Sequence, residues 1–129
     1  HGVWNDADAD VDRVISERAR EGFAQALEGH PFNSVDSLAE EVTQGAAYVW
    51  SGAASDVFTR IHMAERVCEM GPIVGDLEEM LREGLPAIEG WAVENGCKQM
   101  FAQAGRLGLA RVMEKHGYRV AGVIVVKDL

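Results

Sequence analysis

The sequence predicts a mixed α/β (α+β) fold, with a mixed sheet of about five strands and helices on both of its faces. Three observations support this prediction. In the N-terminal part, apolar residues recur at every third or fourth position, as they do in amphipathic helices. In the middle, short runs alternate apolar and polar residues, which indicates an antiparallel meander. A helical pattern then separates this meander from another strand-like run, so we expect those two strands to be parallel.

Helices are expected over residues 11–27, 34–45, 76–96 and 109–117. Ser34 provides the N-cap of the second helix. Asp76 begins the third helix, and Glu79, three residues on, predicts a capping box with it. Pro86 is expected to kink or divide this third helix, because proline lacks a backbone N–H. The acidic run over residues 6–12 is typical of a helix start, because negative side chains interact favourably with the helix dipole there. The run does not match a calcium-binding loop, because it lacks the Gly and Glu that such a loop requires.

Strands are expected over residues 46–51, 56–64, 67–70, 98–104 and 118–126. The last of these is rich in β-branched residues, which favours a strand. Gly71 and Pro72 interrupt the pattern between the third strand and the third helix. Trp50, Trp91 and Phe101 fall at positions expected to face the core.

Composition narrows the classes of function. The 129 residues include 21 acidic and 12 basic side chains, a formal net charge of −9, which argues against direct binding of nucleic acid through its phosphates. No apolar run is long enough to predict a membrane span. Cys68 and Cys97 lack zinc-site spacing, so no metal site is predicted and both are expected to be free, buried thiols.

The C-terminal half carries spaced pairs that resemble a known family. These are Gly75-Asp76, Trp91-Ala92, Gly96-Cys97 and the segment Gly105-Arg106-Leu107-Gly108 before the last helix. Residues 66–129 resemble the GCN5-related N-acetyltransferase (GNAT) family, of the small type encoded by bacteriophages and prophages. The order of the expected elements extends this resemblance to the first half. We therefore expect residues 1–129 to form a single GNAT-like domain.

The resemblance implies a site for the pyrophosphate of acetyl-CoA at the start of the third helix, with Ile73, Val74, Gly75 and Asp76 as the binding residues. Backbone N–H groups and the helix dipole would hold the phosphates there. Pro72 offers no N–H, and Asp76 places a carboxylate where phosphate would arrive. The alternative is that Asp76 is simply the N-cap of the helix.

The resemblance also assigns catalytic positions. Glu69 is the nearest match to the family's general base. Met113 stands where many members have the tyrosine that acts as general acid, and methionine donates no proton. Tyr118 occupies a position usually held by Phe, so it is expected to be a packed ring, with a shifted acid role as the alternative. Arg106, in the turn before the last helix, is expected either to pair with an acidic residue or to bind an anion.

These observations predict a phage-derived, GNAT-like protein with a degenerate acyl-CoA site, used without catalysis in virion assembly or in interaction with the host. It would bind a phage or host protein and reside in the bacterial cytoplasm or in the virion. One alternative is an active N-acetyltransferase that depends on acetyl-CoA. Another is an acidic inhibitor of a host nucleic-acid-binding system. The sequence predicts no oligomeric state.

Overall fold

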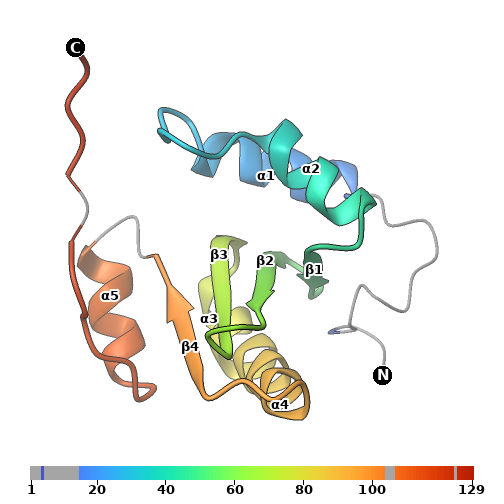
Figure 1. The fold of residues 1–129 in the computed structure, drawn as a ribbon, viewed down its shortest axis with the longest axis vertical. Helices are drawn as coiled ribbons and strands as arrows, with labels where there is room; N and C mark the ends of the chain where they lie inside the picture. Colours follow the sequence, from blue (N-terminus) through green and yellow to red (C-terminus); the bar gives the residue numbers. More distant parts are fainter. Residues whose placement is uncertain (1–3, 5–14, 104–106, 124) are drawn as a thin grey trace.

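The computed structural model describes residue 4 and residues 15–103, 107–123 and 125–129. Its sheet has the strand order β1-β2-β3-β4 (Figure 1), and these strands are Tyr48–Ser51, Ser55–His62, Val67–Gly75 and Gln99–Ala102. The first three strands are antiparallel neighbours, and β3 and β4 are parallel. The mixed α+β fold is therefore confirmed, with a sheet of four strands in the described part of the chain.

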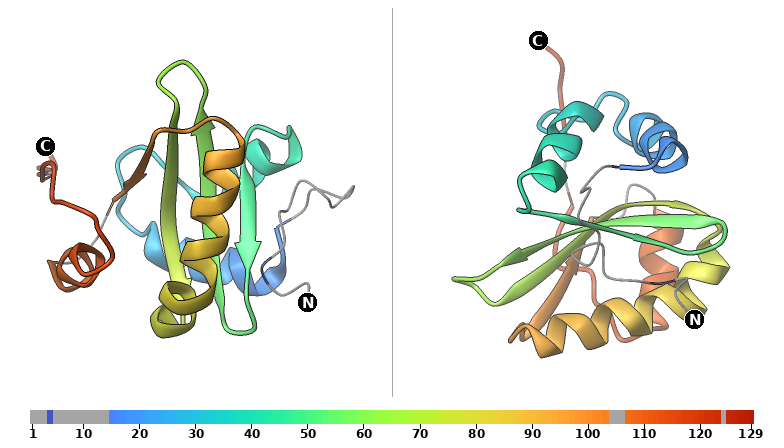
Figure 2. Two further views of the ribbon diagram at one scale, coloured as in Figure 1. Left: turned by 90° about the horizontal axis from the view of Figure 1, so that it is seen from below. Right: turned by 90° about the vertical axis from the view of Figure 1, so that its right-hand side faces the viewer.

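Helices cover both faces of this sheet, as predicted. In the right-hand panel of Figure 2, α1 and α2 lie on one side, and α3, α4 and α5 lie on the other. The helical elements are α1 (Glu17–Ala26), α2 (Val35–Thr43), α3 (Leu77–Glu79), the π-helical turn η2 (Met80–Gly84), α4 (Leu85–Glu94) and α5 (Leu107–Glu114).

Two apolar clusters, one for each face, hold these layers together. Against α1 and α2, buried residues surround Phe23 and Phe58, whose rings meet edge to face with centroids 6.2 Å apart. Against α3, α4 and α5, the cluster includes Trp50, Val57 and Met113. Adjacent residues of β2, Val57 and Phe58, thus enter opposite clusters, as the predicted alternation requires.

Side-chain caps set where the helices begin. Ser16 accepts a hydrogen bond from the N–H of Ala19, so α1 starts at Glu17; the predicted start near residue 11 lies outside the described residues, as does the acidic run before it. Ser34 caps α2 as expected. The kink predicted at Pro86 takes the form of the wide turn η2, closed by a hydrogen bond from the N–H of Leu85 to the carbonyl of Met80.

Three predictions about strands and core positions within residues 67–126 are wrong. The third strand continues to Gly75 instead of ending at residue 70. Its pairing with β2 shifts by one extra residue on β3, next to the cis peptide bond between Gly71 and Pro72. This bulge accommodates the proline within the strand. Phe101 is 46% exposed because it lies on β4, an edge strand. No strand forms in the described part of residues 118–126: the N–H of Tyr118 donates to the carbonyl of Met113 at the end of α5, and the described residues after Tyr118 pair with no strand.

Candidate functional site

The end of β3 and the start of α3 form the region to which the sequence assigns cofactor binding. Ile73, Val74 and Gly75 lie on β3 and pair with β2 along one edge. On the other edge, β4 pairs only with Val67–Met70. The backbone of residues 71–75 therefore faces no described strand on that edge. The sheet opens there between β3 and β4, beside the N-terminus of α3.

Acidic groups occupy this helix start. The carboxylate of Asp76 accepts a hydrogen bond from the N–H of Glu79 at 3.1 Å, so Asp76 is the N-cap of α3. The N–H of Asp76 donates to the carbonyl of Ala54 at 2.9 Å. Arg82, one turn further on, lies 3.6 Å from the carboxylate of Glu78. Asp76 and Glu78 thus place negative charge at the helix start, where a phosphate would need N–H groups.

Glu79 does not complete the predicted capping box. Its buried carboxylate instead accepts hydrogen bonds from the N–H of Ala54, at 3.1 Å, and from the hydroxyl of Ser55. The N–H of Asp76, which a capping box would use, donates to the carbonyl of Ala54 instead. The start of α3 is consequently fixed to the β1–β2 turn by both Asp76 and Glu79.

Arg18 of α1 holds the same turn from the opposite side. Its guanidinium donates to both carboxylate oxygens of Asp56, at 3.0 and 3.1 Å, and to the carbonyl of Ala53 at 2.6 Å. The side chain of Asp56 is only 3% exposed, and the Ser51 hydroxyl also donates to it, at 2.6 Å. The hydrogen bond to Asp56 raises the pKa of Arg18. The sequence analysis did not predict this contact, although Arg18 stands within the apolar stripe of its helix and a charged residue at such a position indicates a specific partner.

Glu69, the predicted general base, lies on the face of the sheet that α2 covers. One carboxylate oxygen accepts from Arg60 at 3.0 Å, and the other lies 2.7 Å from Nε2 of His62. Arg60 also donates to both carboxylate oxygens of Glu41 on α2, each at 2.6 Å. These hydrogen bonds to Glu41, followed by the charges of Glu41 and Glu69, raise the pKa of Arg60. Glu69 therefore belongs to a network of charged side chains around Arg60, whose guanidinium stays positively charged.

Comparison with solved structures identifies the fold. AAC(6')-Iy, in complex with the bisubstrate analogue CoA-S-monomethyl-acetylneamine, matches with a TM-score of 0.63 at 15% identity, covering 88% of this chain and 90% of its own. An acetyltransferase of Trypanosoma brucei matches with a TM-score of 0.60 at 14% identity, covering 90% of this chain and 96% of its own. The chain has the fold of the GNAT acetyltransferases. No protein-family model and no curated protein sequence matches it significantly.

In this GNAT fold, the position assigned to the general acid is apolar. Met113 of α5 is 4% exposed and belongs to the cluster on the α4 side of the sheet. Tyr118 packs against the same cluster, and its hydroxyl donates to the carboxylate of Glu89 at 2.8 Å. Burial, together with that hydrogen bond, raises the pKa of Tyr118 above its ordinary value. Its proton is therefore held firmly at neutral pH. Arg106 lies outside the described residues.

The two cysteines are free thiols, as predicted, but only Cys68 is fully buried. Burial, with smaller contributions from the charges of Cys97 and Glu69, raises the pKa of Cys68 to about 12. This thiol is therefore protonated and unreactive at neutral pH. Among the described residues, no group of three or more Cys, His, Asp or Glu side chains could hold a metal ion.

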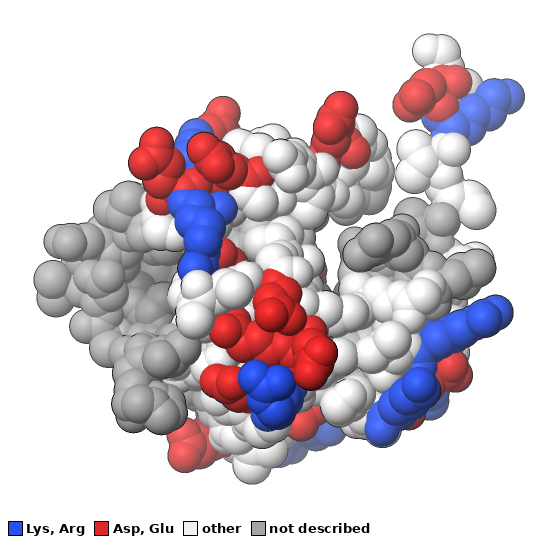
Figure 3. Space-filling model, turned by 180° about the vertical axis from the view of Figure 1, so that it is seen from behind, with Lys and Arg blue, Asp and Glu red and all other residues white. Residues whose placement is uncertain are grey.

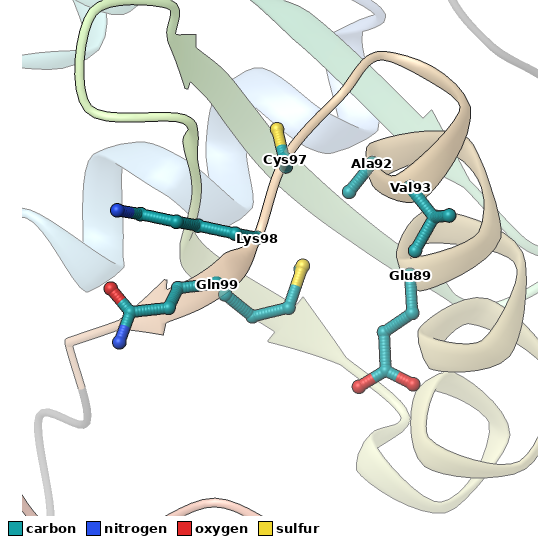
Figure 4. Close-up of a pocket in the computed structure, with 7 residues that line it drawn as sticks. Glu89, Ala92, Val93, Cys97, Lys98 and Gln99 are labelled. Carbon is teal, nitrogen blue, oxygen red and sulfur yellow. The ribbon is translucent and has the colours of Figure 1, made fainter.

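A pocket of about 270 Å³, which no sequence pattern predicts, opens between α4 and β4 (Figure 4). Its lining residues are Glu89, Ala92, Val93, Cys97, Lys98, Gln99 and Met100. In Figure 4, the side chains of Lys98 and Gln99 extend away from the helix that carries Ala92 and Val93. No described residue of β3 lines the pocket, which is formed by α4, β4 and the loop that joins them.

The surface reflects the acidic composition. Figure 3 shows acidic side chains gathered in groups on one face, with basic side chains against several of them. No helix within the described part of the chain is long and apolar enough to cross a membrane.

Proposed function

We propose that this GNAT-fold chain does not catalyse acetyl transfer and serves instead as a phage or prophage protein that binds a phage or host partner, in virion assembly or host interaction. The observation that carries the loss of catalysis is the carboxylate of Asp76, which caps α3 at the place where the fold would hold the cofactor's pyrophosphate. Ile73, Val74 and Gly75 would otherwise supply backbone to that site.

A comparison of two interaction energies at this helix start favours exclusion of the cofactor. A helix N-terminus stabilises an adjacent anion by roughly 0.3–1 kcal/mol at an exposed site. Two like charges 4 Å apart near a protein surface repel by about 4 kcal/mol. Asp76 and Glu78 both place negative charge at this helix start, and Arg82 is already paired with Glu83 at 2.8 Å. Repulsion therefore exceeds the attraction of the dipole.

The acid side of the chemistry supports the same proposal. A general acid must hand a proton to the leaving thiolate, within hydrogen-bond reach of it. Met113 carries no such proton and is packed in the core. The hydroxyl of Tyr118 donates its proton in a hydrogen bond to Glu89. The raised pKa of Tyr118 also opposes release of that proton near neutral pH.

The decisive experiment is a calorimetric titration with acetyl-CoA up to millimolar concentration. We expect no binding heat for the wild-type chain. Asp76→Asn keeps a good N-cap and removes the charge, so this variant should gain measurable affinity. Asp36→Asn, in the first turn of α2, is the matched control and should not bind. Micromolar binding by the wild-type chain, with transfer of the acetyl group to an amine, would overturn the proposal.

The phage role has its own test. Mass spectrometry of purified virions, or recovery of one defined phage or host protein with the tagged chain from infected cells, should place the protein in a particle or complex. A gene far from any phage genes, with neither result obtained, would contradict that role. The acidic-inhibitor alternative stays a prediction; it requires a host nuclease or polymerase that binds the chain.

The second candidate is an active acetyl-CoA-dependent N-acetyltransferase with Glu69 as general base. It is favoured by the shared fold with AAC(6')-Iy, a protein solved with a CoA-containing bisubstrate analogue, and by the 2.7 Å contact of Glu69 with His62. If this candidate holds, Glu69→Gln should lower turnover by about 10²-fold or more, as expected for loss of a general base. Glu65→Gln, an exposed residue outside the network, is the control.

A further inference from the structure

Positive charge is concentrated in the last quarter of this acidic chain. Residues 98–129 contain six basic and two acidic side chains, a formal charge of +4, whereas residues 1–97 contain six basic and nineteen acidic side chains, a formal charge of −13. The six basic residues are Lys98, Arg106, Arg111, Lys115, Arg119 and Lys127. A region whose charge is opposite to that of the rest of the protein creates a local positive potential that attracts anions.

The basic residues of the two regions differ in their pairing. Between residues 15 and 97, four arginines form ion pairs with described carboxylates, and these are Arg18, Arg20, Arg60 and Arg82. None of the described Lys or Arg residues from 98 onward forms an ion pair with another described residue. The same holds for Glu114, the acidic residue of α5. The positive charge of this region is therefore available to an anion from outside the chain.

Two of these cations lie on one face of α5. Arg111 and Lys115 are four positions apart, so their side chains project from the same side of the helix and its last turn, and both residues are exposed. Leu109 and Met113 of the same helix pack in the core cluster, so the charged face points away from the body. Figure 3 shows basic side chains gathered on the α5 side of the molecule, at the lower right.

Arg119 lies next to this face. The N–H of Tyr118 donates to the carbonyl of Met113 at 3.2 Å, and the Tyr118 hydroxyl bonds to Glu89 of α4. These two hydrogen bonds fix the chain directly after the end of α5. Arg119 is the next residue, and it is exposed, so it is held near Lys115. Together, Arg111, Lys115 and Arg119 form a surface that we call the α5 basic patch.

We propose that the α5 basic patch binds an acidic segment of the phage or host partner, an extended chain with carboxylates at alternate positions. This inference rests on the partner-binding role proposed above. One helical turn separates Arg111 from Lys115, a rise of about 6 Å. Alternate residues of an extended chain lie about 6.7 Å apart and point to the same side. Two such carboxylates therefore match the spacing of Arg111 and Lys115, and a third can pair with Arg119.

The charge of the remaining chain favours a protein segment over a nucleic acid. A nucleic acid carries negative charge along its whole length, so phosphates beyond α5 would approach residues 1–97, with their formal charge of −13. A short acidic segment places its few charges on the patch alone. At physiological salt the screening length is about 8 Å, so these carboxylates interact with the adjacent cations more strongly than with the acidic body.

Fluorescence polarisation with a labelled peptide of four Glu-Ser repeats tests the patch. We expect saturable binding in about 0.05 M NaCl and binding several-fold weaker in about 0.3 M NaCl, because salt screens exposed ion pairs. Arg111→Gln combined with Lys115→Gln should raise the dissociation constant about five- to thirtyfold, the effect of losing two surface ion pairs. Glutamine is a good helix former, so this double variant should remain folded, which thermal melting checks.

A second double variant is the matched control. Arg20→Gln combined with Arg82→Gln removes the same charge from two exposed cations that are already paired, on α1 and in η2. This control should leave the dissociation constant within about twofold of the wild-type value. Equal effects of the two double variants would overturn the proposal. It would also be overturned by a lack of binding of the Glu-Ser peptide, or by equally tight binding of an oligothymidylate of the same charge.

The same variants separate this inference from the proposed function. Recovery of one defined phage or host protein from infected cells by the wild-type chain and by the Arg20 and Arg82 control, but not by the Arg111 and Lys115 variant, would support both proposals. Equal recovery by all three chains would overturn the role of the patch and leave the proposed function standing.

Discussion

At the scale of single residues, Tyr118 shows how burial and one hydrogen bond fix a side chain. Burial, and then its hydrogen bond to Glu89, raise the pKa of the phenol above its ordinary value of about 10. The folded state therefore favours the neutral form. The resulting stability is present below the unfolded-state pKa and is lost as pH rises toward the higher folded-state pKa.

We therefore expect the free energy of unfolding to fall more steeply with alkaline pH in the wild-type chain than in Tyr118→Phe. Urea denaturation at pH 8 and at pH 11 measures this difference. At pH 8 the variant should lose about 0.5–1.5 kcal/mol, the value of one hydrogen bond. The buried thiol of Cys68, with its pKa of about 12, adds an alkaline loss common to both proteins. Parallel pH profiles would contradict the prediction.

At the scale of elements, Arg18 joins α1 to the β1–β2 turn. Breaking a buried ion pair costs about 3–5 kcal/mol because one charge is left uncompensated. Asp56 is buried, but half of the Arg18 side chain is exposed, so solvent screens part of the loss. We expect Arg18→Ala to lower the free energy of unfolding by about 2–3 kcal/mol.

The matched control for Arg18 lies on the same helix. Arg20 pairs with Asp36, and the side chains are 46% and 82% exposed. Arg20→Ala should therefore cost less than about 1 kcal/mol. Chemical denaturation of the two variants gives the comparison. Equal losses would show that the Arg18 contact with Asp56 contributes no more than a surface pair.

Two glycines give opposite predictions for the same substitution. Gly75 has a φ of 93°, and a Cβ there would lie 2.2 Å from the carbonyl oxygen of Ala54. Gly75→Ala should therefore destabilise the chain by at least about 2 kcal/mol, since it strains the junction of β3 with α3. Gly90, within α4, has open space around it. Gly90→Ala should stabilise the chain by about 0.5–1 kcal/mol. Thermal melts of both variants test this, and a loss at Gly90 would be inconsistent with it.

These elements also show what the sequence could predict. Apolar periodicity located the helices and the meander, because burial on one face produces that pattern directly. The segment 118–126 has strand propensity, but a strand also needs a hydrogen-bonded neighbour, which propensity does not supply. Periodicity likewise predicts which face of an element is buried, but not which side chains from other elements contact that face. The hydrogen bond between Arg60 and Glu41, 19 positions apart, could therefore not be predicted from the sequence. The N-cap at Asp76 could be predicted, because it depends only on residues within one helical turn.

At the scale of the whole molecule, net charge competes with the specific ion pairs. A formal charge of −9 on 129 residues produces repulsion that favours expanded states. The described ion pairs oppose it, and the strongest of them, at Asp56 and around Arg60, are partly buried. Salt screens long-range surface repulsion more effectively than it screens buried pairs.

We therefore expect the melting temperature at pH 7 to rise by a few degrees between about 0.05 M and about 0.5 M NaCl, as the screening length falls from near 14 Å to near 4 Å. Near the isoelectric point of about 4.8, net repulsion vanishes and the same change in salt should give no such rise. Scanning calorimetry at the two pH values makes the comparison. A melting temperature that falls with salt at pH 7 would mean that the ion pairs outweigh the net charge, and that the acidic surface does not limit stability.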